Sequence, residues 1–122
     1  MTMKELLRPI TEQEIRTFED DGIVCLRQMF SPDWVEKMRE AAEVSLAKPG
    51  ELHAELSEEL GDTGRFFHDT FIWQCNKTCR DFVFRSPAAQ IAQQMMRSQK
   101  INIFFDQWLI KEPDEHENAV AS

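Results

Sequence analysis

Histidine, cysteine and carboxylate side chains are the residues of this chain whose spacing could serve a metal ion. His53 and Glu55 lie two positions apart, and Cys75 and Cys79 lie one helical turn apart. Residues two apart on a helix point away from each other, and a zinc site needs two more ligands than the cysteine pair offers. We therefore interpret His53 as a surface side chain and both cysteines as structural thiols. The sequence predicts no metal ligand and no catalytic residue.

A glutamine within an apolar strand pattern is a second candidate for chemistry. Alternation along residues 101–110 places five side chains on one face, which we expect to be buried: Ile101, Ile103, Phe105, Gln107 and Leu109. A buried amide without a hydrogen-bond partner costs about 1–3 kcal/mol. Gln107 therefore either bonds to a neighbouring strand or loop, or lines a ligand pocket. The spacing alone favours the first alternative, because most buried polar groups are paired inside the protein.

Capping signals predict the helices that position these residues. Thr11 and Glu14 have the spacing of a capping box, which begins a short helix. Ser31 and Pro32 are typical of the N-cap and the first residue of a longer amphipathic helix that continues to residue 47. Both predicted helices therefore lie in the first half of the chain.

Three segments predict strands, because they are rich in β-branched, aromatic and other apolar residues: 23–30, 65–73 and 101–110. His68, in the second of them, is interpreted as a core or rim histidine. Short helices are expected from Asn76 to Phe84 and after Ser86-Pro87, and the polar residues 51–64 are expected to form a connection. The predicted fold class is α+β.

Composition limits the partners. The 122 residues are enough for one domain, and 14 basic against 22 acidic side chains give a net charge of -8, which argues against nucleic acid and anionic membranes. No segment approaches membrane-spanning length and the N-terminus has no signal-peptide pattern. Three cysteines, an odd number in a chain without a secretion signal, predict reduced thiols and a cytoplasmic location.

Four segments, in order, resemble the phytanoyl-CoA dioxygenase family. They are FEDDGIVCLRQMFSPDWVEKMREAAE (18–43), GRFFHDTFIW (64–73), FRSPAAQIAQQMM (84–96) and INIFFDQWLIKEP (101–113). The resemblance covers nearly everything from residue 11 to Pro113. It implies N-terminal helices followed by a double-stranded β-helix, an eight-stranded jelly roll of which this chain carries the first strands. It also implies an iron(II)- and 2-oxoglutarate-dependent oxygenase that acts on a small organic substrate.

The resemblance also indicates which residues meet the cosubstrate. Gln107 matches an inward-facing position that contacts 2-oxoglutarate, which moves the interpretation of Gln107 toward a ligand pocket. Thr70 and Phe71 match the region of a second cosubstrate contact. Lys111 matches a basic residue common at the end of the Gln107 strand, and is either a pocket residue or a surface lysine.

The tail departs from the family pattern. Family members hold iron with a His-x-Asp motif and a distant histidine, and an arginine near that histidine pairs with 2-oxoglutarate. Here His116 is followed two positions later by Asn118, and neither a later histidine nor an arginine is present. We therefore expect residues 1–113 to be the N-terminal part of an oxygenase domain, truncated before its metal site. Residues 114–122 are expected to be an acidic, disordered tail.

A truncated chain is predicted to be inactive. Iron(II) and 2-oxoglutarate are implied for the complete protein, and neither is expected to bind tightly to this chain. The apolar face of residues 101–110 would lose its cover, so we expect poor folding or self-association through the exposed strand. The alternative is a non-catalytic remnant that serves as a binding or interaction module.

Overall fold

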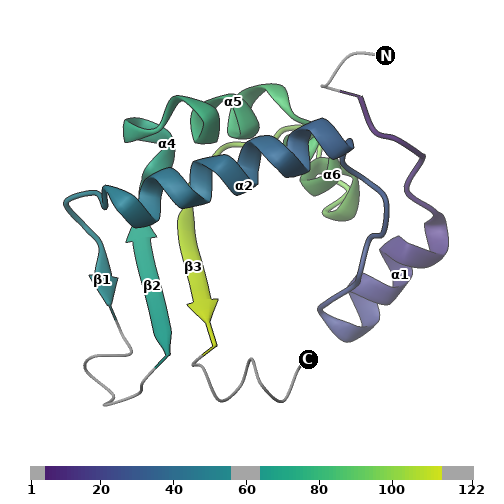
Figure 1. Cartoon of the computed structure of the whole chain (residues 1–122). Coiled ribbons are helices and arrows are strands. Elements are labelled where there is room, and N and C mark those ends of the chain that lie inside the picture. The colour runs from purple at the N-terminus through teal and green to yellow at the C-terminus, as the bar shows by residue number, and fades with distance from the viewer. Residues whose placement is uncertain (1–4, 56–63, 114–122) are drawn as a thin grey trace.

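The computed structural model describes residues 5–55 and 64–113, which form an α+β fold (Figure 1). The elements are α1 (Glu12–Asp21), α2 (Pro32–Ala47), β1 (Ala54–Glu55), β2 (Arg65–Thr70), α4 (Ile72–Cys75), α5 (Lys77–Arg85), α6 (Ala88–Met95) and β3 (Gln107–Glu112). The strands make an antiparallel sheet of order β1-β2-β3. The predicted fold class is therefore confirmed, whereas the jelly roll stays a prediction. The tail at 114–122 lies outside the described residues.

The predicted helix caps are confirmed. The Thr11 hydroxyl accepts the Glu14 N–H at 3.1 Å, and the Glu14 carboxylate accepts the Thr11 N–H at 3.0 Å. Gly22, with a φ of 77°, ends α1 in the left-handed conformation that glycine adopts readily. Ser31 caps the first turn of α2 through its hydroxyl, and Pro32 is the first residue of that helix. None of the described helices is long and apolar enough to cross a membrane.

The register of the sheet separates two faces. Residues directly opposed across an antiparallel pair project to the same side, so alternate pairs of β2 and β3 share a face. One side, here called the open face, carries Phe66, His68 and Thr70 of β2 opposite Lys111, Leu109 and Gln107 of β3. The other side, here called the covered face, carries Phe67, which is 0% exposed, and Asp69, which is 2% exposed.

Helix α2 shields the covered face. Figure 1 shows α2 running across β2 and β3, and the indole Nε1 of Trp108 in β3 donates a hydrogen bond to the hydroxyl of Ser45 in α2 at 3.0 Å. The adjoining core contains Ala41, Ile72 and Cys79, against which Trp108 also packs. Helices α2, α4 and α5 therefore share a hydrophobic core with β3.

The prediction of a strand at 23–30 is wrong. These residues form no strand, Ile23 is 75% exposed, and Gln28 adopts a φ of 59°. Strand-forming composition requires a partner strand, and residues 23–30 pair with none of β1, β2 and β3. The segment is held instead by a side chain, because Arg8 Nε donates to the carbonyl of Arg27 at 2.9 Å.

The other two predicted strands are shorter than expected. β2 ends at Thr70, because Phe71 turns into the left-handed region with a φ of 56° and α4 begins at the next residue. β3 begins only at Gln107, so residues 101–106 reach it without strand pairing. β1, which pairs Ala54 with His68, was not predicted, since two residues are too few for a periodic pattern.

The face of residues 101–110 that was expected to be buried is exposed. Leu109 is 59% exposed, Phe105 45% and Ile103 38%, Gln107 is exposed as well, and Ile101 is half-buried. The predicted alternation applies only from Gln107 onward, because residues 101–106 form no strand, and there α2 covers the opposite side through Trp108. Alternation identifies two faces without identifying which of them meets the core.

Candidate functional site

The open face carries three of the four residues predicted to contact 2-oxoglutarate. Thr70 and Gln107 are direct Cα partners in the register of β2 and β3. Lys111 lies opposite Phe66, four residues along β3 from Gln107, which corresponds to roughly 13 Å between their Cα atoms at the usual rise of a strand. The structure therefore places Thr70 beside Gln107 and leaves Lys111 at the far end of the same face.

His68 joins this pair, although it was not predicted as a site residue. Its Nε2 lies 3.1 Å from the hydroxyl of Thr70, with donor and acceptor set by the imidazole tautomer. It is half-buried, as expected of a rim histidine. The signal was present in the sequence, because residues two apart on a strand share a face. We call the group His68, Thr70 and Gln107 the polar cluster.

Phe71 lies at the end of the polar cluster rather than within it. Its N–H donates to the carbonyl of Asp106 at 2.8 Å, which closes the pairing of the two strands at this end. Its ring meets Phe105 edge to face, with 6.5 Å between the ring centroids. Phe71 directly follows Thr70 and Phe105 lies two residues before Gln107, so the two rings give the cluster an apolar border.

Two carboxylates next to the polar cluster, those of Asp69 and Asp106, accept hydrogen bonds from backbone N–H groups. Asp69 accepts hydrogen bonds from the N–H groups of Gly50 and Thr70, each at 3.0 Å. Asp106 accepts the N–H of Trp73 at 3.1 Å, and burial raises the pKa of its carboxyl. Asp69 directly precedes Thr70, Asp106 directly precedes Gln107, and backbone N–H groups donate to both carboxylates. They hold the ends of β2 and β3 in place and are not free for a ligand.

The described residues do not fit an iron site. Across residues 5–55 and 64–113, no three histidine, cysteine, aspartate or glutamate side chains are grouped to hold a metal ion. His53 is exposed, with Nδ1 2.7 Å from the carbonyl of Gly50, and Glu55 pairs with Arg65 at 2.6 Å. Burial raises the pKa of the Cys79 thiol to about 12, whereas metal binding needs a thiolate. His116 lies outside the described residues.

The arrangement suits a small anion better than a cation. A glutamine amide and a threonine hydroxyl are hydrogen-bond donors, and the histidine can donate in either tautomer. Lys111 adds the one cation of the open face as defined above. The cluster can therefore offer hydrogen bonds to a carboxylate, and its Thr70 hydroxyl and His68 imidazole also lie at the separation of a nucleophile and a general base.

Comparisons with known proteins do not identify the chain. No family model, no curated protein and no solved structure matches it. The relation to the phytanoyl-CoA dioxygenase family therefore stays a prediction from the sequence.

Proposed function

We propose that this chain is the N-terminal, cosubstrate-contacting part of an iron(II)- and 2-oxoglutarate-dependent oxygenase of the phytanoyl-CoA dioxygenase family. In the complete protein, which we place in the cytoplasm, the substrate is a small organic molecule. The residues that would hold iron lie outside the described part of this chain.

The pairing of Thr70 with Gln107 carries the proposal. The resemblance implies a 2-oxoglutarate contact for both residues, and they are Cα partners on the face of the sheet that α2 leaves uncovered. Two positions that are unrelated by local sequence therefore meet where one small ligand could contact both.

The chemistry of 2-oxoglutarate agrees with this placement. The molecule has two carboxylates and a keto oxygen, all hydrogen-bond acceptors, and hydrogen bonds to charged acceptors are the stronger kind. The Gln107 amide and the Thr70 hydroxyl would donate to the same end of the ligand, with His68 holding the hydroxyl through the 3.1 Å contact. Lys111 is too far along β3 to share that end, so its contribution is long-range attraction.

Titration of the full chain with 2-oxoglutarate, followed by backbone and side-chain amide NMR shifts, tests the proposal. We expect weak binding, with the largest shifts at Thr70, Gln107 and their neighbours. Gln107→Leu should remove these shifts, whereas Gln90→Leu, an equally drastic change at an exposed position of α6, should retain them. The dimethyl ester of 2-oxoglutarate, which lacks the charges, should give no response.

A binding or interaction module is the second candidate function, and the exposed apolar residues of segment 101–106 favour it. Shifts that are absent from the open face, or that persist unchanged in Gln107→Leu, would contradict the cosubstrate proposal and leave this alternative.

A further inference from the structure

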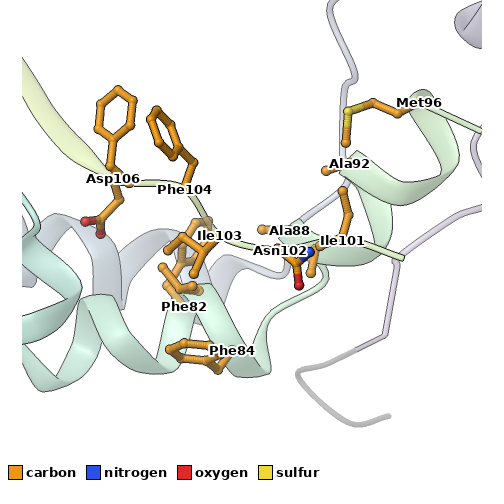
Figure 2. Close-up of a pocket in the computed structure, with 13 residues that line it drawn as sticks. Phe82, Phe84, Ala88, Ala92, Met96, Ile101, Asn102, Ile103, Phe104 and Asp106 are labelled. Atoms are coloured by element: carbon orange, nitrogen blue, oxygen red, sulfur yellow. The ribbon is translucent and has the colours of Figure 1, made fainter. Parts of the chain in front are cut away.

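An apolar groove lies between helices α5 and α6 and the segment that leads into β3, and it meets the border of the polar cluster at Phe105. Its volume is about 510 Å³, and its lining is mainly aromatic, aliphatic and alanine side chains. Figure 2 shows Phe104 standing on one side of the groove and Met96 on the other. The floor between them includes Ile103 and Ala88.

The side chains around this groove are unusually exposed for their size. Phe104 is 89% exposed, and Met96, Phe84, Phe105 and Ile103 are between 38% and 55% exposed. The ring of Phe104 has one aromatic neighbour among the described residues, Phe105, at 5.3 Å between centroids. Contiguous apolar surface of this kind marks an interaction site more often than an accident of folding.

We propose that the groove is the contact surface between two copies of this chain, with Phe104 of each copy inserted into the groove of the other. A twofold interface uses the same patch on both subunits, so that patch must carry both a projection and a recess. Phe104 is the projection, and the space between Phe104 and Met96 is the recess.

The available area is close to what such a pair needs. The five exposures add up to between two and three whole large side chains per copy. At about 150–250 Å² for each large side chain, complete burial of these five side chains on both copies would cover roughly 800–1,400 Å². A specific interface needs about 1,000 Å² or more, so the upper part of this range reaches the threshold before any polar rim is counted.

Local charge does not oppose a second copy at this place. Each chain carries a net charge of -8, so most approaches of two copies are repulsive. The groove has a single ionisable side chain in its lining, Asp106, whose carboxylate already accepts the N–H of Trp73. Two copies can therefore meet here without opposing free charges, and added salt should strengthen the contact by screening the rest of the surface.

Sedimentation equilibrium of the full chain tests this proposal. We expect a concentration-dependent dimer whose dissociation constant falls as salt is raised to about 0.5 M. Phe104→Ser should raise the dissociation constant at least about tenfold, because two buried aromatic anchors are lost per dimer. Ile23→Ser is the matched control, since Ile23 is 75% exposed and does not line the groove, and it should leave the constant unchanged.

Cross-linking locates the contact. In a background of Cys25→Ser and Cys75→Ser, which removes the exposed thiols, a chain with Phe104→Cys is mixed with a chain carrying Ala92→Cys. We expect a disulfide between the two different chains after mild oxidation. A monomer at all concentrations, or Phe104→Ser chains that associate as the unchanged chain does, would overturn the proposal. The NMR response of Gln107 to 2-oxoglutarate is read separately, so failure of one proposal is distinguishable from failure of the other.

Discussion

Trp108 donates its indole N–H to the hydroxyl of Ser45 at 3.0 Å, across 63 positions of sequence. This bond joins the last strand to the second helix, and it lies on the covered face of the sheet. It is the contact that turns Trp108 inward and therefore turns Gln107 and Leu109 outward.

Removing this bond should destabilise the fold. Ser45 is 6% exposed and Trp108 is half-buried, so Ser45→Ala would leave a partly buried indole N–H without its acceptor, at about 1 kcal/mol of unfolding free energy. Urea unfolding measures the loss. Trp108→Phe and the double substitution complete a cycle, in which the second change should cost less once the first is made. Strictly additive losses would contradict the bond.

The Glu14 carboxylate at the start of α1 should stay ionised at lower pH than an ordinary glutamate. Glu14 has a pKa lowered to about 2 from its ordinary 4.5, chiefly by the hydrogen bonds from Arg8 and next by the Thr11 N–H. A lowered pKa in the folded state means that the contribution of Glu14 to stability is complete above pH 4.5 and is lost as the pH falls toward 2. NMR titration of the side-chain carboxyl should show the low midpoint.

Arg8→Gln should raise that midpoint without restoring it fully, because the Thr11 N–H still donates to the carboxylate at 3.0 Å. Arg85→Gln, on α5, serves as the control and should leave Glu14 unaffected. A Glu14 midpoint near 4.5 in the unchanged chain would show that the Arg8 contact does not persist in solution.

The three thiols should differ in reactivity. Cys25 and Cys75 are exposed, whereas Cys79 is buried and has a pKa raised to about 12, mainly by burial. Because the thiolate is the reactive form, iodoacetamide at pH 8 should modify Cys25 and Cys75 and spare Cys79. Peptide mass spectrometry reads the three sites, and modification of Cys79 should appear only after urea is added. Equal labelling of all three in the native chain would argue against the core described above.

The chain alone should not convert 2-oxoglutarate to succinate. Iron(II) oxygenases of the proposed family hold the metal with three protein ligands. The described residues bring no three histidine, cysteine, aspartate or glutamate side chains together. The assay uses tag-free chain with iron(II) and ascorbate, beside a reaction without protein. Succinate above that blank would show that the metal ligands are complete in this chain.

Local signals predicted the parts of the fold that depend on near neighbours. The capping box of Thr11 and Glu14 and the Ser31 cap are decided within three residues, and the structure contains them. Strand pairing is decided elsewhere in the chain, so residues 23–30 have strand-like composition without a strand. The buried side of the strand that begins at Gln107 was misassigned for the same reason, since the Ser45 contact of Trp108 lies far away in the sequence.

Only part of the candidate site could likewise be predicted from the sequence. Gln107 and Thr70 could be named from the resemblance, but their pairing required the register of β2 and β3. His68 was within reach of the sequence, because its spacing to Thr70 places both on one face of a strand. The groove beside Phe104 was not, since it forms only where α5, α6 and residues 101–106 converge.

The order in which the chain can assemble follows from the pairing of Thr70 with Gln107. Between these two residues the chain forms α4, α5 and α6 before it returns to β2. Closing a loop of this length costs entropy that the first strand contacts must overcome, whereas the three helices depend on local contacts. The helices should therefore form early in folding and the β2–β3 pairing late. The polar cluster would then be among the last parts of the molecule to be completed.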